Sequence, residues 1–163
     1  MYKLITIALQ CIALNISAAT LEGRVVGVAD GDTITVLDAN RDQHKIRLQG
    51  IDAPEKDQAY GEKSKQILHA LVHGKAVQVD YTKSDKYGRI VGKVMLNSVD
   101  VCLQQIISGM AWHYKKYQDE QTPEDRKTYR ESETMAQARK TGLWADGQPI
   151  PPWEHRRIKK GQQ

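Results

Sequence analysis

Acidic and basic side chains stand close together in the stretch from Arg47 to Glu55. An alternation of apolar and basic residues ends at Gly50, and Pro54 then stiffens the turn that carries Asp52 and Glu55. Carboxylates beside a guanidinium suit a metal ion next to an oxyanion, above all a phosphate. The stretch is equally compatible with a solvated surface turn, so the rest of the chain has to distinguish the two interpretations.

A second turn adds possible ligands for a hard cation. Asp32 closes a hairpin turn that begins at Asp30, so Asp32 and Asp52 could supply carboxylates and Ala53 a main-chain carbonyl. The turn is not an EF-hand loop, because Ile34 stands where that loop needs an oxygen ligand. The histidines and cysteines do not have the spacing of zinc ligands. The sequence therefore favours an oxygen-ligand site over a zinc site.

The loop from Asp85 to Arg89 supplies groups that bind phosphate. Lys86 and Arg89 can hold an anion, Tyr87 can hydrogen-bond or stack, and Gly88 permits a tight turn. Taken alone, the loop is an ordinary hairpin connection. It gains significance only beside the two acidic stretches.

Hydrophobic periodicity predicts the elements that position these turns. Period-two patterns predict strands, and apolar residues on one face predict helices. The predicted strands cover residues 21–29, 33–37, 43–49, 76–81 and 89–96, and the predicted helices cover 59–74, 101–109 and 122–140. Thr122 and Pro123 are a strong helix start, and Leu143 and Trp144 are expected to anchor the end of that helix. The order predicts an α+β, mainly β fold: an OB-fold, a five-stranded antiparallel Greek-key barrel with three α-helices.

The N-terminus has the pattern of a targeting segment. Lys3, an apolar run to Ile16 and small residues after it predict a secretory signal peptide over residues 1–19, cleaved after Ala18 or Ala19. A buried N-terminal strand or a retained anchor is the alternative. Export predicts a periplasmic or secreted protein that has no membrane attachment after cleavage.

The mature chain is expected to be one domain with a tail. Residues 20–145 form the predicted domain, and the Pro-rich, basic residues 146–163 are expected to be an extended, partly disordered tail with Trp153 docked. Cys102 would be the only remaining cysteine, so a monomer would contain no disulfide. The net charge of the whole chain is +4, and loss of Lys3 lowers it by one. A polyanionic partner is compatible with this charge but not required by it.

An ordered set of motifs resembles the staphylococcal nuclease (thermonuclease) family. The set is Asp30–Thr33, Ile46–Leu48, Asp52–Glu55 and Asp85–Arg89, followed by Gly109–Ala111 and Gly142–Trp144. Each motif is weak alone, but the order and spacing are specific, and the resemblance covers about residues 21–145. It implies an OB-fold barrel and calcium-dependent hydrolysis of phosphodiester bonds in DNA and RNA, with 3′-phosphorylated products.

The resemblance also implies roles for particular residues. Asp32, Asp52 and the main-chain carbonyl of Ala53 would bind Ca²⁺, and Glu55 would bind the attacking water, as the general base. Arg47 and Arg89 would grip the scissile phosphate. Contacts to the rest of the substrate would come from Lys86, Tyr87, Tyr114 and Tyr117. The family often has Thr where this chain has Ala53, a change that a main-chain ligand should tolerate.

The chemistry of the residues agrees with a nuclease. A phosphodiester resists attack because it is already negative, so a cation and two guanidiniums that cancel charge in the transition state address the main difficulty. The alternative is a non-catalytic nucleic-acid-binding OB-fold module, which could dispense with the acids. The enzyme interpretation is favoured because all five charged residues are present: Asp32, Arg47, Asp52, Glu55 and Arg89. A calcium-stabilised periplasmic scaffold would leave the two arginines without a task. DNA and RNA are the expected partners, and the protein is expected to be a monomer.

Overall fold

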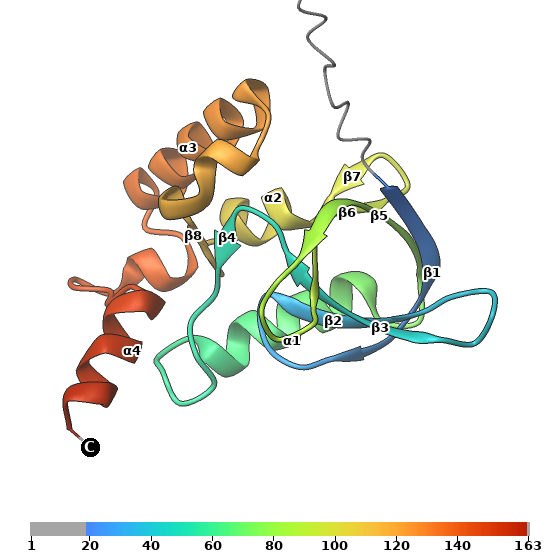
Figure 1. The fold of residues 1–163 in the computed structure, drawn as a ribbon. Helices are drawn as coiled ribbons and strands as arrows, with labels where there is room; N and C mark the ends of the chain where they lie inside the picture. The colour runs from blue at the N-terminus through green and yellow to red at the C-terminus, as the bar shows by residue number, and fades with distance from the viewer. Residues whose placement is uncertain (1–18, 163) are drawn as a thin grey trace, which may run out of the picture.

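The computed structural model describes residues 19–162, so the predicted signal peptide lies outside the described residues except for Ala19. Five long strands form a barrel, and α3 and α4 lie together on one side of it (Figure 1). The long strands are β1 (Ala19–Val28), β2 (Thr33–Leu37), β3 (Gln43–Leu48), β5 (Ala76–Ser84) and β6 (Ile90–Leu96). The short strands are β4 (Ile51–Asp52), β7 (Val99–Asp100) and β8 (Trp112–His113). The α-helices are α1 (Gly61–Val72), α2 (Val101–Ile107), α3 (Pro123–Ala138) and α4 (Pro152–Gly161), and the 3₁₀ helices are η1 (Lys115–Glu120) and η2 (Gly142–Ala145).

The strand pairing closes the barrel. β1 pairs antiparallel with β2 and β5, β2 with β3, and β5 with β6. A parallel pairing of β3 with β6 joins the two edges and sets Ile46 opposite Ile90 and Arg47 opposite Val91. The connection from β3 to β5 runs through α1. This arrangement confirms the predicted OB-fold and the predicted order of strands and helices.

The barrel interior and the inner faces of three helices share one core. Val25, Ile34, Ile46 and Val94 are fully buried strand residues. The helices add further buried side chains: Leu68 and Val72 from α1, Ile106 from α2, and Tyr129 from α3. Burying one such aliphatic side chain contributes about 1.5–3 kcal/mol. The apolar seam of each helix therefore fixes the helix against the barrel, and the loops between these elements inherit defined positions.

Helix α3 begins and ends as the sequence predicts. The Thr122 side chain accepts a hydrogen bond from the Asp125 N–H, and Pro123 occupies the first helical turn. Leu143 and Trp144 are buried with Ala136 in a second, smaller cluster. The predicted anchoring of the helix end is confirmed.

The C-terminal segment differs from the prediction. Residues 152–161 form the helix α4, where an extended and partly disordered tail was expected. Pro152 lies in the first turn, where a proline loses no helical hydrogen bond. Glu154 near the start and Lys159 and Lys160 near the end complement the helix dipole. The prolines therefore start a helix here, and the basic residues are part of it.

Within residues 19–162, no helix combines the length and the apolar character that crossing a bilayer requires.

Candidate active site

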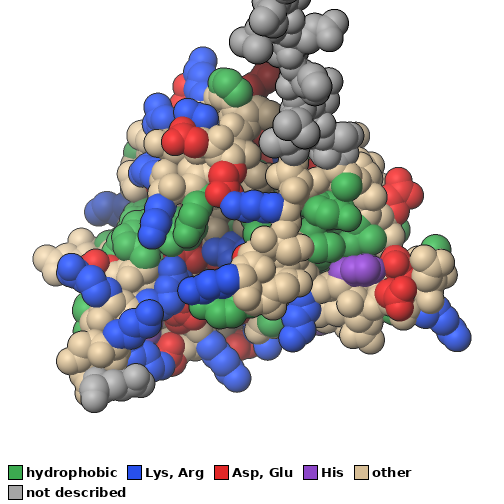
Figure 2. Space-filling view, viewed as in Figure 1, with side chains coloured by type: hydrophobic (Ala, Val, Ile, Leu, Met, Phe, Trp, Pro, Cys, Tyr) green, Lys and Arg blue, Asp and Glu red, His purple; other side chains and the backbone are tan. Residues whose placement is uncertain are grey.

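The predicted site residues line one cleft of about 660 Å³ at the end of the barrel. Its walls come from the β1–β2 turn, the segment after β3, the β5–β6 loop, η1 and α4. All ten predicted residues are among those that line it: Asp32, Arg47, Asp52, Ala53, Glu55, Lys86, Tyr87, Arg89, Tyr114 and Tyr117. Figure 2 shows Lys and Arg side chains gathered around acidic ones where the barrel meets α3 and α4. The structure thus brings the separate motifs together.

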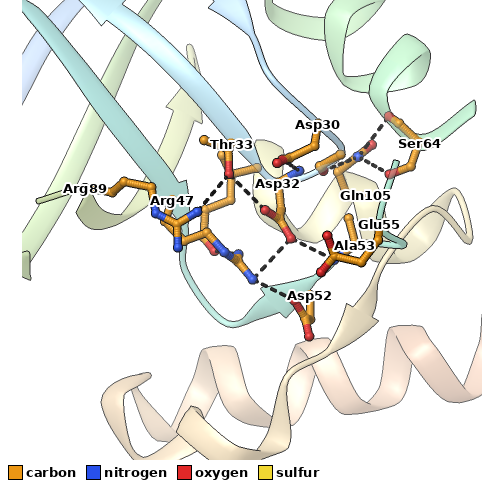
Figure 3. Close-up of polar contacts among 12 residues, drawn as sticks. Asp30, Asp32, Thr33, Arg47, Asp52, Ala53, Glu55, Ser64, Arg89 and Gln105 are labelled. Carbon is orange, nitrogen blue, oxygen red and sulfur yellow. Dashed lines mark hydrogen bonds and ion pairs between the residues drawn. The ribbon is translucent and has the colours of Figure 1, made fainter. Parts of the chain in front are cut away.

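Two carboxylates converge on the Arg47 guanidinium (Figure 3). Its Nη2 lies 2.9 Å from Asp52 Oδ1 and 3.1 Å from Asp32 Oδ2. Strand pairing creates this arrangement, because Thr33 pairs with Arg47 and the Leu48 N–H donates to the Asp32 carbonyl at 2.9 Å. Asp32 at the start of β2 is thereby held beside the end of β3, where Arg47 lies.

The break between β3 and β4 brings Asp52 into the same space. Gly50 adopts φ +74°, a conformation that L side chains rarely adopt, and a Cβ there would collide with the Gln121 side chain. After the turn, β4 pairs with β8, so that Asp52 lies opposite Trp112. The Ala53 N–H then donates to Asp32 Oδ2 at 2.8 Å. The turn therefore depends on glycine for its backbone and on Asp32 for its anchor.

Burial and charge shift the proton affinities of these groups. Burial works against the charged form of Arg47, but Asp32 and Asp52 outweigh it and raise the pKa of the guanidinium. Burial also raises the pKa of Asp52, although Arg156 and Arg47 oppose this effect. Burial, followed by the charge of Asp32, raises the pKa of Asp30 to about 6. Water and the surrounding side chains therefore solvate the negative charge of these carboxylates poorly. A bound cation would stabilise that charge.

The same atoms fit a hard cation. Asp32 Oδ2 and Asp52 Oδ1 both lie within 3.1 Å of Arg47 Nη2, so the two carboxylates are close enough together to share one cation beside the guanidinium. Among residues 19–162, no group of three or more His, Cys, Asp and Glu side chains has metal-binding geometry. A cation between Asp32 and Asp52 would therefore complete its shell with neutral oxygens, such as main-chain carbonyl or water. Calcium accepts such mixed oxygen shells.

Arg89 lies on the phosphate-binding side of the cleft. Its Nε and Nη2 each lie 2.8 Å from Asp85 Oδ2, which orients the guanidinium. Its Nη1 lies 3.4 Å from Thr33 Oγ1, and the Thr33 hydroxyl donates to Asp32 Oδ1 at 3.1 Å. Thr33 therefore links the second arginine to the acidic cluster (Figure 3). Tyr87 is strongly exposed and lies under both Lys86 and Arg89, at 5.0 and 5.6 Å from its ring centroid.

Glu55 lies on the loop between β4 and α1 and is much more exposed than Asp32 and Asp52. Its side chain is 38% accessible, whereas that of Asp52 is 3% accessible. The main chain at Glu55 is fixed by Gln58, which contacts both its N–H and its carbonyl. Gly61 packs so closely on the Glu55 carbonyl that a Cβ there would collide with it. The backbone of Glu55 is therefore held firmly, while its carboxylate remains accessible.

The aromatic side of the cleft is partly covered. Tyr114 stacks on Trp153 of α4, with ring centroids 5.5 Å apart and planes 7° apart. Tyr117 meets Tyr114 edge-on at 5.0 Å and keeps 43% of its surface exposed. The expected docking of Trp153 is thus confirmed, and its partner is one of the predicted substrate contacts.

A buried scaffold beneath the acids was not predicted. Gln105 of α2 is fully buried, and its amide donates to the Gly31 carbonyl at 2.7 Å and to Ser64 Oγ at 3.2 Å. The Ser64 hydroxyl in turn donates to the Met110 carbonyl at 2.7 Å. These contacts support the turn that presents Asp32 (Figure 3). The available signal was two polar residues among the apolar positions of predicted helices.

Arg156 is the other residue that was missed. It reaches from α4 to Asp52 Oδ2 at 2.7 Å and to Glu55 Oε1 at 2.6 Å. The sequence predicts the basic run 156–160 only as part of an extended tail, with no role in the site. A usable signal was the three-residue spacing of Trp153 and Arg156, which puts both on one face of a helix begun by Pro152.

Comparisons with known proteins agree with the geometry. The family model described as "Staphylococcal nuclease homologue" matches residues 45–146. An "Uncharacterized endonuclease" of Escherichia coli is 41% identical over 155 residues, which cover 94% of this chain and 96% of that protein. An "Uncharacterized endonuclease" of Haemophilus influenzae is 38% identical over 161 residues, 97% of this chain and 87% of that protein. A "Micrococcal nuclease" of Shigella flexneri is 38% identical over 153 residues, 87% of this chain and 84% of that protein.

Proposed function

The chain belongs to the staphylococcal nuclease family, and on that premise we propose that it is a calcium-dependent, sugar-nonspecific nuclease acting on DNA and RNA. The proposal depends above all on one observation: the carboxylates of Asp32 and Asp52 lie together beside the Arg47 guanidinium, in a cleft that also contains Glu55 and Arg89. Nuclease-named relatives that match most of the chain support the hydrolysis of nucleic acids in general. The dependence on calcium, the residue roles and the product chemistry belong to the proposal.

Asp32, Asp52 and the Ala53 carbonyl would hold the calcium ion. When bound, the ion would supply positive charge against the negative charge that develops on the phosphate oxygens. The two carboxylates are fixed by the barrel, Asp32 through the Ala53 N–H and Thr33, and Asp52 through the β4–β8 pair. Their positions therefore need little reorganisation at the moment of reaction.

Arg47 and Arg89 would bind the scissile phosphate. Both guanidiniums line the cleft, and their planar forks can each offer two N–H groups to phosphate oxygens. Asp85 orients Arg89 and the acidic pair orients Arg47, so that each keeps donors available while held. Lys86 and Tyr87 on the same loop would contact a neighbouring phosphate, and Tyr114 and Tyr117 would contact the nucleotide itself.

Glu55 would accept a proton from the attacking water at a carboxylate oxygen. The water oxygen would bond to phosphorus while the bond from phosphorus to the 5′ oxygen breaks, and the departing 5′ oxygen would take a proton from solvent water. The products would be a 3′-phosphate and a 5′-hydroxyl. A general base contributes about 10²–10⁴ in rate, and the accessible carboxylate of Glu55 on a firmly held backbone suits this task.

The test is a nuclease assay on single-stranded DNA and RNA, with calcium and with excess chelator, for wild type and Glu55→Gln. We expect calcium-dependent cleavage of both substrates, and a rate about 10²–10⁴ lower for Glu55→Gln. The variant should still bind a nucleotide inhibitor with calcium. Full activity in chelator would refute the metal assignment, and a near-normal rate of the variant would refute the role of Glu55. A non-catalytic binding module would bind nucleic acid and cleave neither substrate.

Export is a further part of the proposal. It is supported by the charged, apolar and small-residue pattern of residues 1–19. N-terminal sequencing of the protein recovered from outside the cytoplasm should begin at Ala19 or Thr20, and an intact Met1 in that fraction would contradict it.

A further inference from the structure

Helix α4 brings a positive charge into the cleft from outside the barrel. Figure 1 shows α4 at the end of the chain, beside the segment that joins β4 to α1. Arg156 Nη2 lies 2.7 Å from Asp52 Oδ2, and its Nη1 lies 2.6 Å from Glu55 Oε1 and 3.3 Å from Asp52 Oδ1. One guanidinium therefore pairs with both the carboxylate assigned to the metal and the carboxylate assigned to the attacking water.

The contacts of α4 indicate how firmly it is held. Pro152 is its only buried residue among those described. Trp153 stacks on Tyr114 and meets Trp112 edge-on at 5.7 Å. The remaining ties are the pairs of Arg156 with the buried Asp52 and with Glu55, and ion pairs at the surface such as Lys159 with Asp57 at 2.5 Å. Exposed pairs of the latter kind contribute little. A helix with so little buried surface has a low free energy of local unfolding.

The two arginines near Asp52 therefore differ in their freedom to leave. Arg47 lies on the barrel strand β3, between the core residues Ile46 and Leu48, and its side chain is 13% accessible. Arg156 is 39% accessible and belongs to a helix that can separate without opening the core. A divalent cation at Asp52 would repel both guanidiniums. Arg156 can move away from Asp52 at a small cost in free energy, whereas Arg47 cannot.

We infer that α4 is a strap that calcium displaces: Arg156 is the counter-ion of Asp52 and Glu55 until the metal replaces it. The inference rests on the proposed function, because it takes Asp52 as a metal ligand and Glu55 as the base. The strap would set the calcium concentration at which Glu55 becomes free to bind water. It would also uncover the face of Tyr114 at the same step, since Trp153 and Arg156 belong to one helix.

Calcium affinity measured by isothermal titration calorimetry, without substrate, tests the strap. If the strap is docked in about nine molecules in ten, its release tightens the apparent dissociation constant about tenfold, because apparent affinity scales with the competent fraction. We expect this effect in Arg156→Gln. Arg157→Gln is the matched control: it removes the same charge one residue along the helix, where Arg157 pairs only with Glu154, and should change affinity by less than about twofold. Unchanged or weaker affinity in Arg156→Gln overturns the inference.

Trp153→Ala separates a moving strap from a local charge effect. It alters no charge but removes the stacking contact that docks the helix. We expect calcium to bind more tightly to this variant as well. If Arg156→Gln tightens binding and Trp153→Ala does not, the effect is local electrostatics and the strap is refuted. Thermal unfolding of each variant checks that the barrel is intact.

Hydrogen exchange gives a readout that is independent of affinity. Amides of residues 153–161 should exchange faster in wild type when calcium is added, while those of β3 should not. Equal exchange in α4 with and without calcium refutes displacement.

If wild type neither binds calcium nor needs it for cleavage, the proposed function itself fails. If wild type is a calcium-dependent nuclease whose half-activating calcium concentration is unchanged in Arg156→Gln, only the strap fails. A collapse of kcat at saturating calcium with unaltered calcium affinity would place Arg156 among the phosphate-binding residues instead.

Discussion

The barrel and helix α4 contribute to the same cleft with very different rigidity. Arg47, Asp32 and Asp52 lie at strand ends whose pairing and buried neighbours fix them. Arg156 lies on a helix with one buried residue and extends its side chain into the cleft, and Trp153 of the same helix stacks on Tyr114 at the cleft wall. The difference separates two tasks. Groups that stabilise charge in a transition state gain from rigidity, whereas a group that occupies the site in the resting state must be able to leave.

Replacing a rigidly held arginine of the cleft is expected to lower the rate nearly as much as replacing Glu55. Arg47→Lys keeps the charge but replaces the planar guanidinium by a single ammonium nitrogen. One nitrogen can then no longer pair with Asp32 and Asp52 while another donates to the phosphate. We expect kcat/KM to fall about 10²–10³-fold, the usual loss for one transition-state donor. Far-ultraviolet circular dichroism should be unchanged. Arg89→Lys should show a loss of the same order, and Lys63→Arg, on the exposed face of α1, is a control expected to have no effect. A rate within about threefold of wild type for Arg47→Lys would remove it from the catalytic set.

An intermediate effect tests whether the rigid half depends on its buried scaffold. Gln105→Ala leaves the Gly31 carbonyl without its side-chain donor in a closed interior. An unsatisfied buried polar group costs about 1–3 kcal/mol of the free energy of unfolding. Urea denaturation measures it, with the neighbouring and more accessible Gln104→Ala as the control. Equal stability of the two variants would show that the turn carrying Asp32 holds its shape unaided.

The smallest expected effect concerns a buried histidine behind the aromatic side of the cleft. His113 is fully buried, and burial lowers its pKa although the hydrogen bond with Gln121 opposes this. The unfolded chain therefore binds a proton at higher pH than the folded chain does. Stability should be lost as pH falls below about 6.5 toward the folded pKa. The loss should be smaller in His113→Gln than in wild type when urea midpoints at pH 7.5 and 5.5 are compared. Parallel pH profiles would mean that His113 titrates alike in both states.

Local patterns in the sequence predict the rigid half of the molecule well. The strands and α1 to α3 follow from periodicity and capping, and the turns at Asp32, Asp52 and Arg89 follow from glycine, proline and charge. What such patterns omit is contact between distant segments. Arg156 meets Glu55 across 101 residues of chain, and Gln105 meets Gly31 across 74. Both contacts depend on where packed helices end up, which no local pattern specifies.

The C-terminal helix shows a second limit. Its prolines and basic residues have the composition of a disordered tail, and an isolated helix of ten residues is marginal in water. It is ordered because Trp153 stacks on Tyr114 and Arg156 forms ion pairs with Asp52 and Glu55. Tertiary contacts therefore decide its conformation, and they are the contacts that would change when a cation enters the cleft.

The parallel pairing of β3 with β6 bears on when the chain first acquires its site during folding. Arg47 is paired with Val91, two residues beyond Arg89, and the intervening chain includes the whole of α1 and β5. This pairing joins segments far apart in sequence, and such contacts form late because the loop must first be ordered. The two guanidiniums therefore come together only when the barrel closes. A nascent or partly folded chain would have its arginines and acids scattered along the backbone, so the capacity to cut nucleic acid would arise in the final cooperative step of folding.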